Sequence, residues 1–474
     1  MKINTNVSDT FAVGINDLEM LVREALSRGG SYADLYFEST FYSTLMLRDG
    51  EVSSGGHYED YGCGIRVLSG EKTGYAYSES TDIPSLLLAA RAAGEIADGR
   101  STCALAFGKT DFSSLLGNRY PMAMRWNGCD PAGFAATLKE IEQRIRKRDN
   151  RVSKVIAMLG WSESEVMMYN SFGELTSDLR PMGSLSVSVI FQDGKSTQTK
   201  SASRSFRLGA EFFCEENINA VVEESTSGID EMFEAKRPKG GQMSVVMGAG
   251  ASGILLHEAM GHAFEADFNR KGQSIFSDKM GRQICPKGIN IVDDATITGC
   301  RGSLNYDDEG VPGQKTYMVT DGVLTSYLHD RISAAYYGVS PTGNGRRESF
   351  RYNPIPRMRA TYMENGNSTR EDLIASVKKG VYVDEFSNGE VKIGEGDFTF
   401  YVRSGFLIED GRLTMPVKDI NIIGNGPQAL SDIRGVAADL TVDPGKWTCG
   451  KGQSVPVSCG IPSVLIDNLT VGGE

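Results

Sequence analysis

The sequence predicts an α+β protein of two unlike halves. The N-terminal half is expected to be an α/β arrangement of helices on an antiparallel or mixed sheet, because helix-periodic segments bracket strand-like ones. The C-terminal half is expected to be β-rich and barrel-like, because it alternates in the strand manner almost throughout. One central helix interrupts it and carries His257 and His262. A chain of 474 residues also exceeds one ordinary hydrophobic core.

The first elements are a helix, several strands and a second helix. One helix face is formed by apolar residues three or four apart: Leu18, Leu21, Val22, Ala25 and Leu26. Gly29-Gly30 ends this helix. Strand-like alternation follows in four short segments: Ala33–Glu38, Ser43–Leu47, Gly64–Leu68 and Gly74–Tyr77. Asp49-Gly50 is a turn signal, and a second helix is expected from Asp82 to Ala97.

The segment from Gly99 to Cys129 is irregular and rich in Gly, Ser and Asn, as a linker or long surface loop would be. This segment is a possible boundary within the N-terminal region. Asp130-Pro131 then begins a helix that ends in a basic run, which suits the negative end of a helix dipole. Strands are expected from Val155 to Phe206, with turns at Asn170-Ser171 and Asp193-Gly194, and a helix from about Glu216 to Phe233.

The polar run from Lys236 to Gly241 is the best candidate for a domain boundary. It divides the chain into an N-terminal region, 1–235, and a C-terminal domain, 240–474. In the second region, hairpin turns are expected where Gly follows Asp or Asn between alternating runs: Asp321-Gly322, Asn388-Gly389 and Asp410-Gly411.

Composition narrows the class of protein. The 61 acidic residues outnumber the 49 basic ones, and the net charge of −12 disfavours nucleic-acid binding, which needs basic patches. The eight cysteines are scattered without a CxxC pair, as reduced cytosolic thiols would be. The N-terminus lacks the apolar core of a signal peptide, and no stretch approaches the ~20 apolar residues that span a bilayer. We therefore expect a cytoplasmic protein with no membrane or nucleic-acid partner.

The stretch from Ser244 to Asp267 predicts a strand, a glycine turn and then the central helix. Gly248, Gly250 and Gly253 spell G-x-G-x-x-G, which resembles a dinucleotide-binding fingerprint. Such a site needs a second apolar strand ending in an acid ~20 residues later. The chain is polar there, so we interpret the glycines as a tight strand-to-helix turn.

His257, Glu258 and His262 are the candidate metal-site residues of the central helix. Two imidazoles beside a carboxylate are the parts of a zinc site with its general base. In the spacing H-E-x-x-x-H the histidines are five apart, which turns them ~140° from each other on a regular helix. Both can reach one metal only if the helix is distorted near Met260-Gly261. Without a metal, one histidine would be buried and the other exposed.

A catalytic zinc needs a third protein ligand and an open position for water. Spacing does not choose among the residues that could supply this ligand: Cys285, Cys300, Cys449, Cys459, Glu265, Asp267 and His329.

Longer motifs show a resemblance to a known family. G-I-L-L-H-E-A-M-G-H-A-F-E-A-D-F-N-R-K-G is similar to the signature of the TldD/PmbA family of modulator-of-gyrase peptidases. R-G-S-L-N-Y-D-D-E-G, T-G-N-G-R-R-E-S and V-R-S-G-F-L-I-E-D-G-R-L are further matches. The intact H-E-x-x-x-H resembles the metal-carrying, TldD-like branch, since the PmbA-like branch lacks it.

The resemblance implies a zinc-dependent peptidase. Its metal ligands would be His257, His262 and the cysteine of T-C-G-K-G-Q, Cys449, and Glu258 would be the general base. Bound zinc would lower the pKa of a water toward ~7, and Glu258 would take its proton and pass it to the leaving amine. The expected substrate is a peptide or unfolded protein segment, and the expected assembly is a homodimer or a heterodimer with a PmbA-like subunit.

Further residues are weaker candidates. Arg346 and Arg347 could bind substrate carbonyls or a terminal carboxylate, and His329 could line the pocket. The arginines and the turn Asp307–Gly310 could equally form ion pairs that hold loops together. Two alternative functions stay open: a non-catalytic peptide-binding subunit of a TldD/PmbA-like complex, and a zinc hydrolase of a non-peptide amide.

Overall fold

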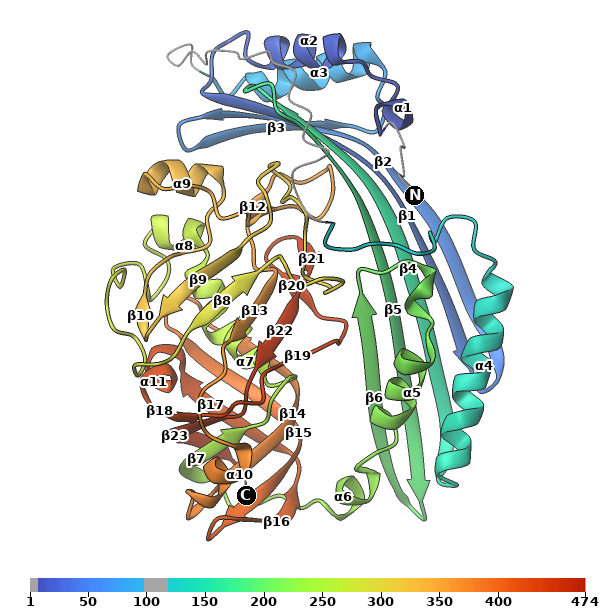
Figure 1. The fold of residues 1–474 in the computed structure, drawn as a ribbon, viewed down its shortest axis with the longest axis vertical. Coiled ribbons are helices and arrows are strands. Elements are labelled where there is room, and N and C mark those ends of the chain that lie inside the picture. The colour runs from blue at the N-terminus through green and yellow to red at the C-terminus, as the bar shows by residue number, and fades with distance from the viewer. Residues whose placement is uncertain (1–6, 98–117, 474) are drawn as a thin grey trace.

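The N-terminal half is built on one long, curved antiparallel sheet (Figure 1). The computed structural model describes residues 7–97 and 118–473. The strand order is β3-β2-β1-β4-β5-β6. The strands are β1 (Tyr32–Arg48), β2 (Glu51–Ser69), β3 (Lys72–Ser78), β4 (Val152–Asn170), β5 (Leu175–Asp193) and β6 (Ser196–Phe206).

These strands are longer than the alternation of side chains predicts. The expected segments from Ala33 to Leu47 are one strand of 17 residues, and Gly64–Leu68 is the end of a strand of 19. The prediction of short strands is wrong because residues 51–59 of β2 are all exposed and show no alternation. Pairing with β1 defines that part of the strand. Positive φ at Asp49 and Gly50 confirms the predicted turn, which joins β1 to β2.

Helices cover one face of this sheet. They are α1 (Val7–Phe11), α2 (Ile15–Ala25), α3 (Ile83–Gly94), α4 (Pro131–Arg148), η1 (Ala210–Phe212), α5 (Glu215–Glu224) and α6 (Ile229–Glu234). Asp82 and Asp130 cap α3 and α4 through their carboxylates, as predicted. The single helix expected from Glu216 to Phe233 is wrong, because Gly228 takes a left-handed φ of 69° and separates α5 from α6.

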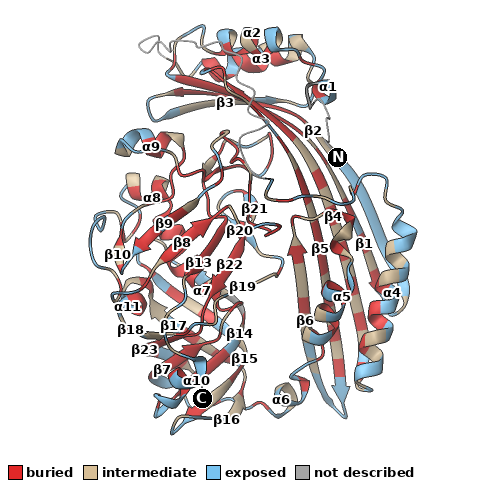
Figure 2. Cartoon of the chain, viewed as in Figure 1, coloured by how far each residue is buried: buried red, intermediate tan, exposed pale blue. Residues whose placement is uncertain are grey.

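Strand alternation gives the two sheet faces different roles. Odd-numbered residues of β1 pack under the helices, Leu35 and Phe37 in the α2–α3 core and Leu45 and Leu47 in the α4–α5 core. Even-numbered residues face the C-terminal half, where Tyr36 joins a buried cluster with Phe350. In Figure 2, buried residues run along the strands of both halves, and many residues of α4 are exposed. Of the irregular segment predicted at 99–129, residues 118–129 are irregular, and 99–117 lie outside the described residues.

The C-terminal half contains a closed five-stranded barrel, which confirms the barrel-like prediction. β14 pairs with β7 and β15, β7 with β23, β23 with β17, and β17 with β15. The strands are β7 (Gly241–Met247), β14 (Lys379–Val391), β15 (Asp397–Glu409), β17 (Ile420–Asn425) and β23 (Val464–Gly472), with β16 (Arg412–Val417) and β18 (Ile433–Val436) paired at the outside.

A second sheet and two short hairpins complete this half. The sheet has the order β10-β9-β8-β13-β22-β19: Val323–Leu324, Lys315–Thr320, Ile291–Asp294, Ala360–Met363, Ser458–Ile461 and Thr441–Val442. The hairpins are β11 (Gly345–Arg346) with β12 (Ile355–Pro356), and β20 (Thr448–Gly450) with β21 (Ser454–Pro456).

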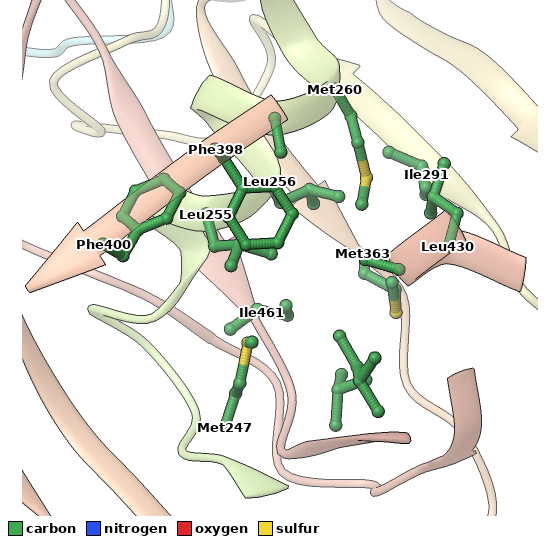
Figure 3. Close-up of a cluster of buried hydrophobic side chains, with 14 of the residues drawn as sticks. Met247, Leu255, Leu256, Met260, Ile291, Met363, Phe398, Phe400, Leu430 and Ile461 are labelled. Carbon is green, nitrogen blue, oxygen red and sulfur yellow. The ribbon is translucent and has the colours of Figure 1, made fainter. Parts of the chain in front are cut away.

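The helical segments are α7 (Gly253–Leu256), η2 (His257–Gly261), η3 (His262–Phe264), α8 (Ala266–Arg270), α9 (Arg331–Tyr337), α10 (Arg370–Ala375) and α11 (Gly426–Ser431). The central helix, α7 with η2 and η3, lies inside the main core of the C-terminal half. In Figure 3, Leu255, Leu256 and Met260 lie among side chains of both sheets, including Phe398 of β15 and Ile291 of β8. This burial fixes the position of the histidines.

Among the described residues, no helix has both the length and the apolar character needed to cross a membrane.

Two of the three predicted hairpin turns of this half are confirmed. Asp321-Gly322 joins β9 to β10, and Asp410-Gly411 joins β15 to β16, with positive φ at all four residues. The turn expected at Asn388-Gly389 is wrong, because these residues lie within β14. A Cβ at Gly389 would overlap the ring of Phe400, so this glycine serves close packing between β14 and β15.

Candidate metal centre

The stretch from Ser244 to Asp267 forms the expected strand, turn and helix. β7 ends at Met247, and Gly250 takes a φ of 85°, which allows the chain to turn sharply into α7. A Cβ at Gly248 would lie 2.7 Å from the hydroxyl of Tyr382, and one at Gly253 would lie 2.6 Å from the backbone of Gly460. The three glycines therefore form a tight turn packed against neighbouring strands, as interpreted from the sequence.

The helix is distorted where the histidine spacing requires it. η2 is a π-helical turn, and the backbone N–H of His262 donates to the carbonyl of His257, five residues earlier. The extra residue of H-E-x-x-x-H is absorbed by this wider turn. The two imidazoles therefore lie on the same side, with ring centroids 5.2 Å apart.

Gly261 is required by packing and not by its backbone conformation. Its φ of −57° and ψ of −49° are ordinary helical values, so the backbone conformation does not require glycine. A Cβ at this position would overlap Sδ of the buried Met358 and lie 3.0 Å from its Cε. Glycine is needed because the π turn packs directly on this methionine.

Cys449 completes a group of three potential ligands. It lies on β20, at the start of a hairpin far along the chain. Ligand atoms of His257, His262 and Cys449 all lie within 4.8 Å of one another, and the three residues are buried. Cys449 Sγ is 3.2 Å from His262 Nε2.

The chemistry of this group fits a zinc ion. Two imidazole nitrogens and a thiolate are typical zinc donors, and three protein ligands leave a fourth position open. Burial alone would raise the pKa of Cys449, but His257 and His262 outweigh it and bring the pKa to about 5. The sulfur therefore carries negative charge in a buried place. His257 Nδ1 also has no hydrogen-bond partner among the described residues.

Glu265 orients His262. His262 Nδ1 lies 3.0 Å from a carboxylate oxygen of Glu265, which leaves Nε2 facing Cys449. Burial favours the neutral acid, but Lys451 and His262 lower the pKa of Glu265 to about 2. A hydrogen bond from an imidazole to an ionised carboxylate fixes the ring tautomer and strengthens the opposite nitrogen as a ligand.

The hairpin that carries Cys449 is held to the central helix by charged residues. Lys451 Nζ lies 3.0 Å from Glu265 and 2.7 Å from Asp267. The guanidinium of Arg357 donates to the carbonyls of Cys449, at 2.6 Å, and Gln453, at 2.8 Å. Sequence reasoning missed the positioning residues Lys451 and Arg357; Lys451 lies two residues after the candidate ligand in T-C-G-K-G-Q.

Glu258 lies beside the triad at its open side. Its Oε2 is 3.9 Å from His262 Nε2, and its side chain keeps 25% of its surface exposed while the neighbouring ligands are buried. A carboxylate in this position can exchange protons with water next to the ligand group.

The other candidate ligands lie elsewhere or have other partners. Cys285 lies against the Gly322 carbonyl, Cys300 contacts Ser458, and His329 packs between the rings of Tyr327 and Tyr337. Burial lowers the pKa of His329 to about 4, so its imidazole is neutral. Cys459 lies beside His257, and burial raises its thiol pKa.

The two arginines separate into different environments. Arg347 donates to the carbonyl of Asp308 and lies over the ring of Tyr36, which ties the C-terminal half to β1. Within the described part of the chain, Arg346 donates to the carbonyls of Met358 and Pro456 and to no carboxylate. Asp307, Asp308 and Glu309 accept hydrogen bonds from backbone amides and from buried arginines that include Arg66 and Arg180. This turn and Arg347 thus hold the two halves together.

Family models and known proteins match this chain along most of its length. The family model described as the PmbA/TldA metallopeptidase C-terminal domain matches residues 240–473, and those for domain 1 and the central domain match 33–97 and 130–227. A metalloprotease TldD homolog of Haemophilus influenzae is 40% identical over 94% of each chain. A zinc metalloprotease TldD homolog of Saccharolobus solfataricus is 33% identical over 61% of this chain and 65% of its own.

A solved structure, TldE from Thermococcus kodakarensis, has the same fold, with a TM-score of 0.76 at 19% identity over 96% of this chain and all of its own. The match of the family models to all three regions, together with the Haemophilus relative, decides the family. The chain belongs to the PmbA/TldD family of metallopeptidases.

Proposed function

We propose that this protein is a zinc-dependent peptidase that hydrolyses peptides or unfolded protein segments. The observation that carries this proposal is the buried group of His257, His262 and Cys449 with Glu258 at its open side. The name of the Saccharolobus relative supports zinc as the metal. When bound, zinc would polarise the peptide carbonyl and make a water acidic enough to react near neutral pH.

Each residue of the site has a role in this proposal. His257, His262 and Cys449 hold the metal, and Glu265 keeps the imidazole of His262 in the tautomer whose Nε2 is free to bind it. Glu258 accepts the proton of the attacking water and delivers it to the leaving amine. Its partly exposed side chain suits this role because water can reach it.

The test is the Glu258→Gln variant. Glutamine keeps the shape of the side chain and loses the base, so we expect the variant to retain zinc and lose peptide cleavage. Cleavage is followed by mass spectrometry of an unfolded-peptide library, and zinc by elemental analysis. Cleavage at the wild-type rate would overturn the role of Glu258. Zinc retention with no cleavage by either form would favour a non-catalytic peptide-binding subunit.

Assembly and location are part of the proposal. We expect a homodimer or a heterodimer with a PmbA-like subunit, which the likeness to a TldE structure supports. Mixing the chain with such a subunit in the cleavage assay tests whether the pair is needed.

All described cysteines are free thiols, which supports a cytoplasmic protein. Separate cores on either side of residues 235–240 support the two-region organisation predicted from sequence.

A further inference from the structure

A cavity of about 590 Å³ lies between the even-numbered face of the N-terminal sheet and the C-terminal half. Its walls include Tyr36 and Glu38 of β1, Met182 of β5, and Ser454 and Pro456 of β21. Seven basic and four acidic side chains line it, so the cavity has an excess of positive charge in a chain whose net charge is −12. None of the residues that could hold a metal is among its lining residues.

Part of this positive charge is already neutralised. Arg180 pairs with Asp308 at 2.6 Å, and Arg351 pairs with Asp60 at 2.6 Å. Three arginines remain without a carboxylate partner among the described residues: Arg207, Arg301 and Arg346.

Arg207 is the clearest case. It is 5% exposed, and its Nε is buried without a hydrogen-bond partner among the described residues. The guanidinium carbon of Arg207 lies over the ring of Tyr120, 5.5 Å from the ring centroid. Burial lowers the pKa of Arg207, although nearby acidic groups act to raise it. A largely buried guanidinium without a carboxylate partner is costly, because its charge is only partly compensated.

Arg301 and Arg346 have only neutral acceptors among the residues that the structure describes. Arg301 donates to the carbonyl of Trp447 and to hydroxyls that include Ser205, and Arg346 donates to two backbone carbonyls. Burial, with a smaller effect of the charge of Arg207, lowers the pKa of each guanidinium to about 9. Arg207 thus lies close enough to repel both Arg301 and Arg346, and all three line the same cavity. Such a cluster is stabilised when an anion binds between its members.

We propose that Arg207, Arg301 and Arg346 form a binding site for a carboxylate of the peptide substrate. The location favours a substrate group: Arg301 holds Trp447 and Thr448, the two residues before Cys449, and Arg346 holds Pro456, which pairs with Thr448 across the hairpin. Arg301 and Arg346 therefore contact the hairpin segment that carries Cys449. The site rests on the proposed peptidase function, and it would select peptides with a C-terminal carboxylate or an acidic side chain.

Binding is measured by isothermal titration calorimetry in the Glu258→Gln background, so that peptides stay intact. Three unlabelled peptides of one sequence are compared: a neutral C-terminal amide, the same peptide with a C-terminal acid, and the amide with one internal Gln replaced by Glu. We expect at least one carboxylate peptide to bind about tenfold more tightly than the neutral one. Which of the two does so identifies the carboxylate recognised. Equal binding of all three would overturn the proposal.

The variant Arg207→Gln is expected to abolish this preference and leave binding of the neutral peptide unchanged. Its matched control is Arg204→Gln, which removes an arginine that pairs with Glu224 and does not line the cavity. Because Arg207→Gln removes an unpaired buried charge, its melting temperature should not fall. Persistence of the preference in this variant would contradict the assignment.

Competition tests the same site without any change at the arginines. Sodium acetate, at the ionic strength of a sodium chloride control, should weaken binding of the carboxylate peptide and not of the neutral one. Equal effects on both peptides would count against the site. The outcome is distinguishable from failure of the peptidase proposal: loss of the hydrolytic role removes cleavage by the wild type and leaves the binding preference intact.

Discussion

The close contact between the π turn and Met358 makes a quantitative prediction for Gly261→Ala. In a helical position alanine is about 1 kcal/mol more favourable than glycine, so propensity alone predicts stabilisation. The added Cβ would overlap Sδ of Met358, which is fully buried and cannot swing into solvent. Overpacking of this kind costs about 1–3 kcal/mol, and more when the backbone must shift. We therefore expect net destabilisation and a displaced His262.

The assay is denaturant unfolding combined with zinc analysis, in a double-mutant cycle with Met358→Ala. The methionine change alone should cost about 2–5 kcal/mol by leaving a cavity. The double variant should be at least about 1 kcal/mol more stable than the sum of the single effects, because the new methyl group enters that cavity. The matched control is Gly133→Ala in α4, where a Cβ meets nothing within 4 Å and should stabilise. Additive effects, or a stabilised Gly261→Ala, would refute the packing argument.

Two further predictions follow from buried carboxylates. Glu265→Gln should weaken zinc retention by about tenfold or more, since the amide no longer holds His262 by a charge-assisted bond; competition with a chelator measures this, and unchanged retention would contradict it. Burial raises the pKa of Glu38 from 4.5 to about 7, so the folded state favours the proton. The protonated side chain contributes fully to the free energy of unfolding below pH 4.5. Roughly 3 kcal/mol of this free energy is lost as the pH rises through 7. Unfolding titrations of the wild type and Glu38→Gln from pH 4 to 8 should therefore diverge, and parallel curves would refute this.

The central helix shows what the sequence can predict and why. Five-residue spacing of His257 and His262 allows a shared metal only on a distorted helix, and the π turn has this distortion. The reason for Gly261 depends on Met358, almost a hundred residues away, so no local pattern could reveal it. The long strands escaped prediction for a similar reason, because pairing along an exposed edge of β2 leaves no alternation.

The rest of the candidate site depends on contacts between distant segments. Cys449 follows His262 by 187 residues, and spacing alone left seven candidates for the third ligand. Only the resemblance to a family selected it before the fold was known. Arg207 carries no sequence signal at all, because what distinguishes it is its place in the cavity wall without a carboxylate partner among the described residues. A missing partner of this kind can be recognised only when the positions of the neighbouring groups are known.

The most direct test of the account is the zinc content of the purified chain and of two cysteine variants. Cys449 and Cys459 are both buried thiols beside His257, but Cys449 alone belongs to the compact group with both histidines. We expect zinc in the wild type, its loss in Cys449→Ala, and its retention in Cys459→Ala, with cleavage of unfolded peptide lost in the first variant and kept in the second. Zinc retained by Cys449→Ala and lost from Cys459→Ala would contradict the account.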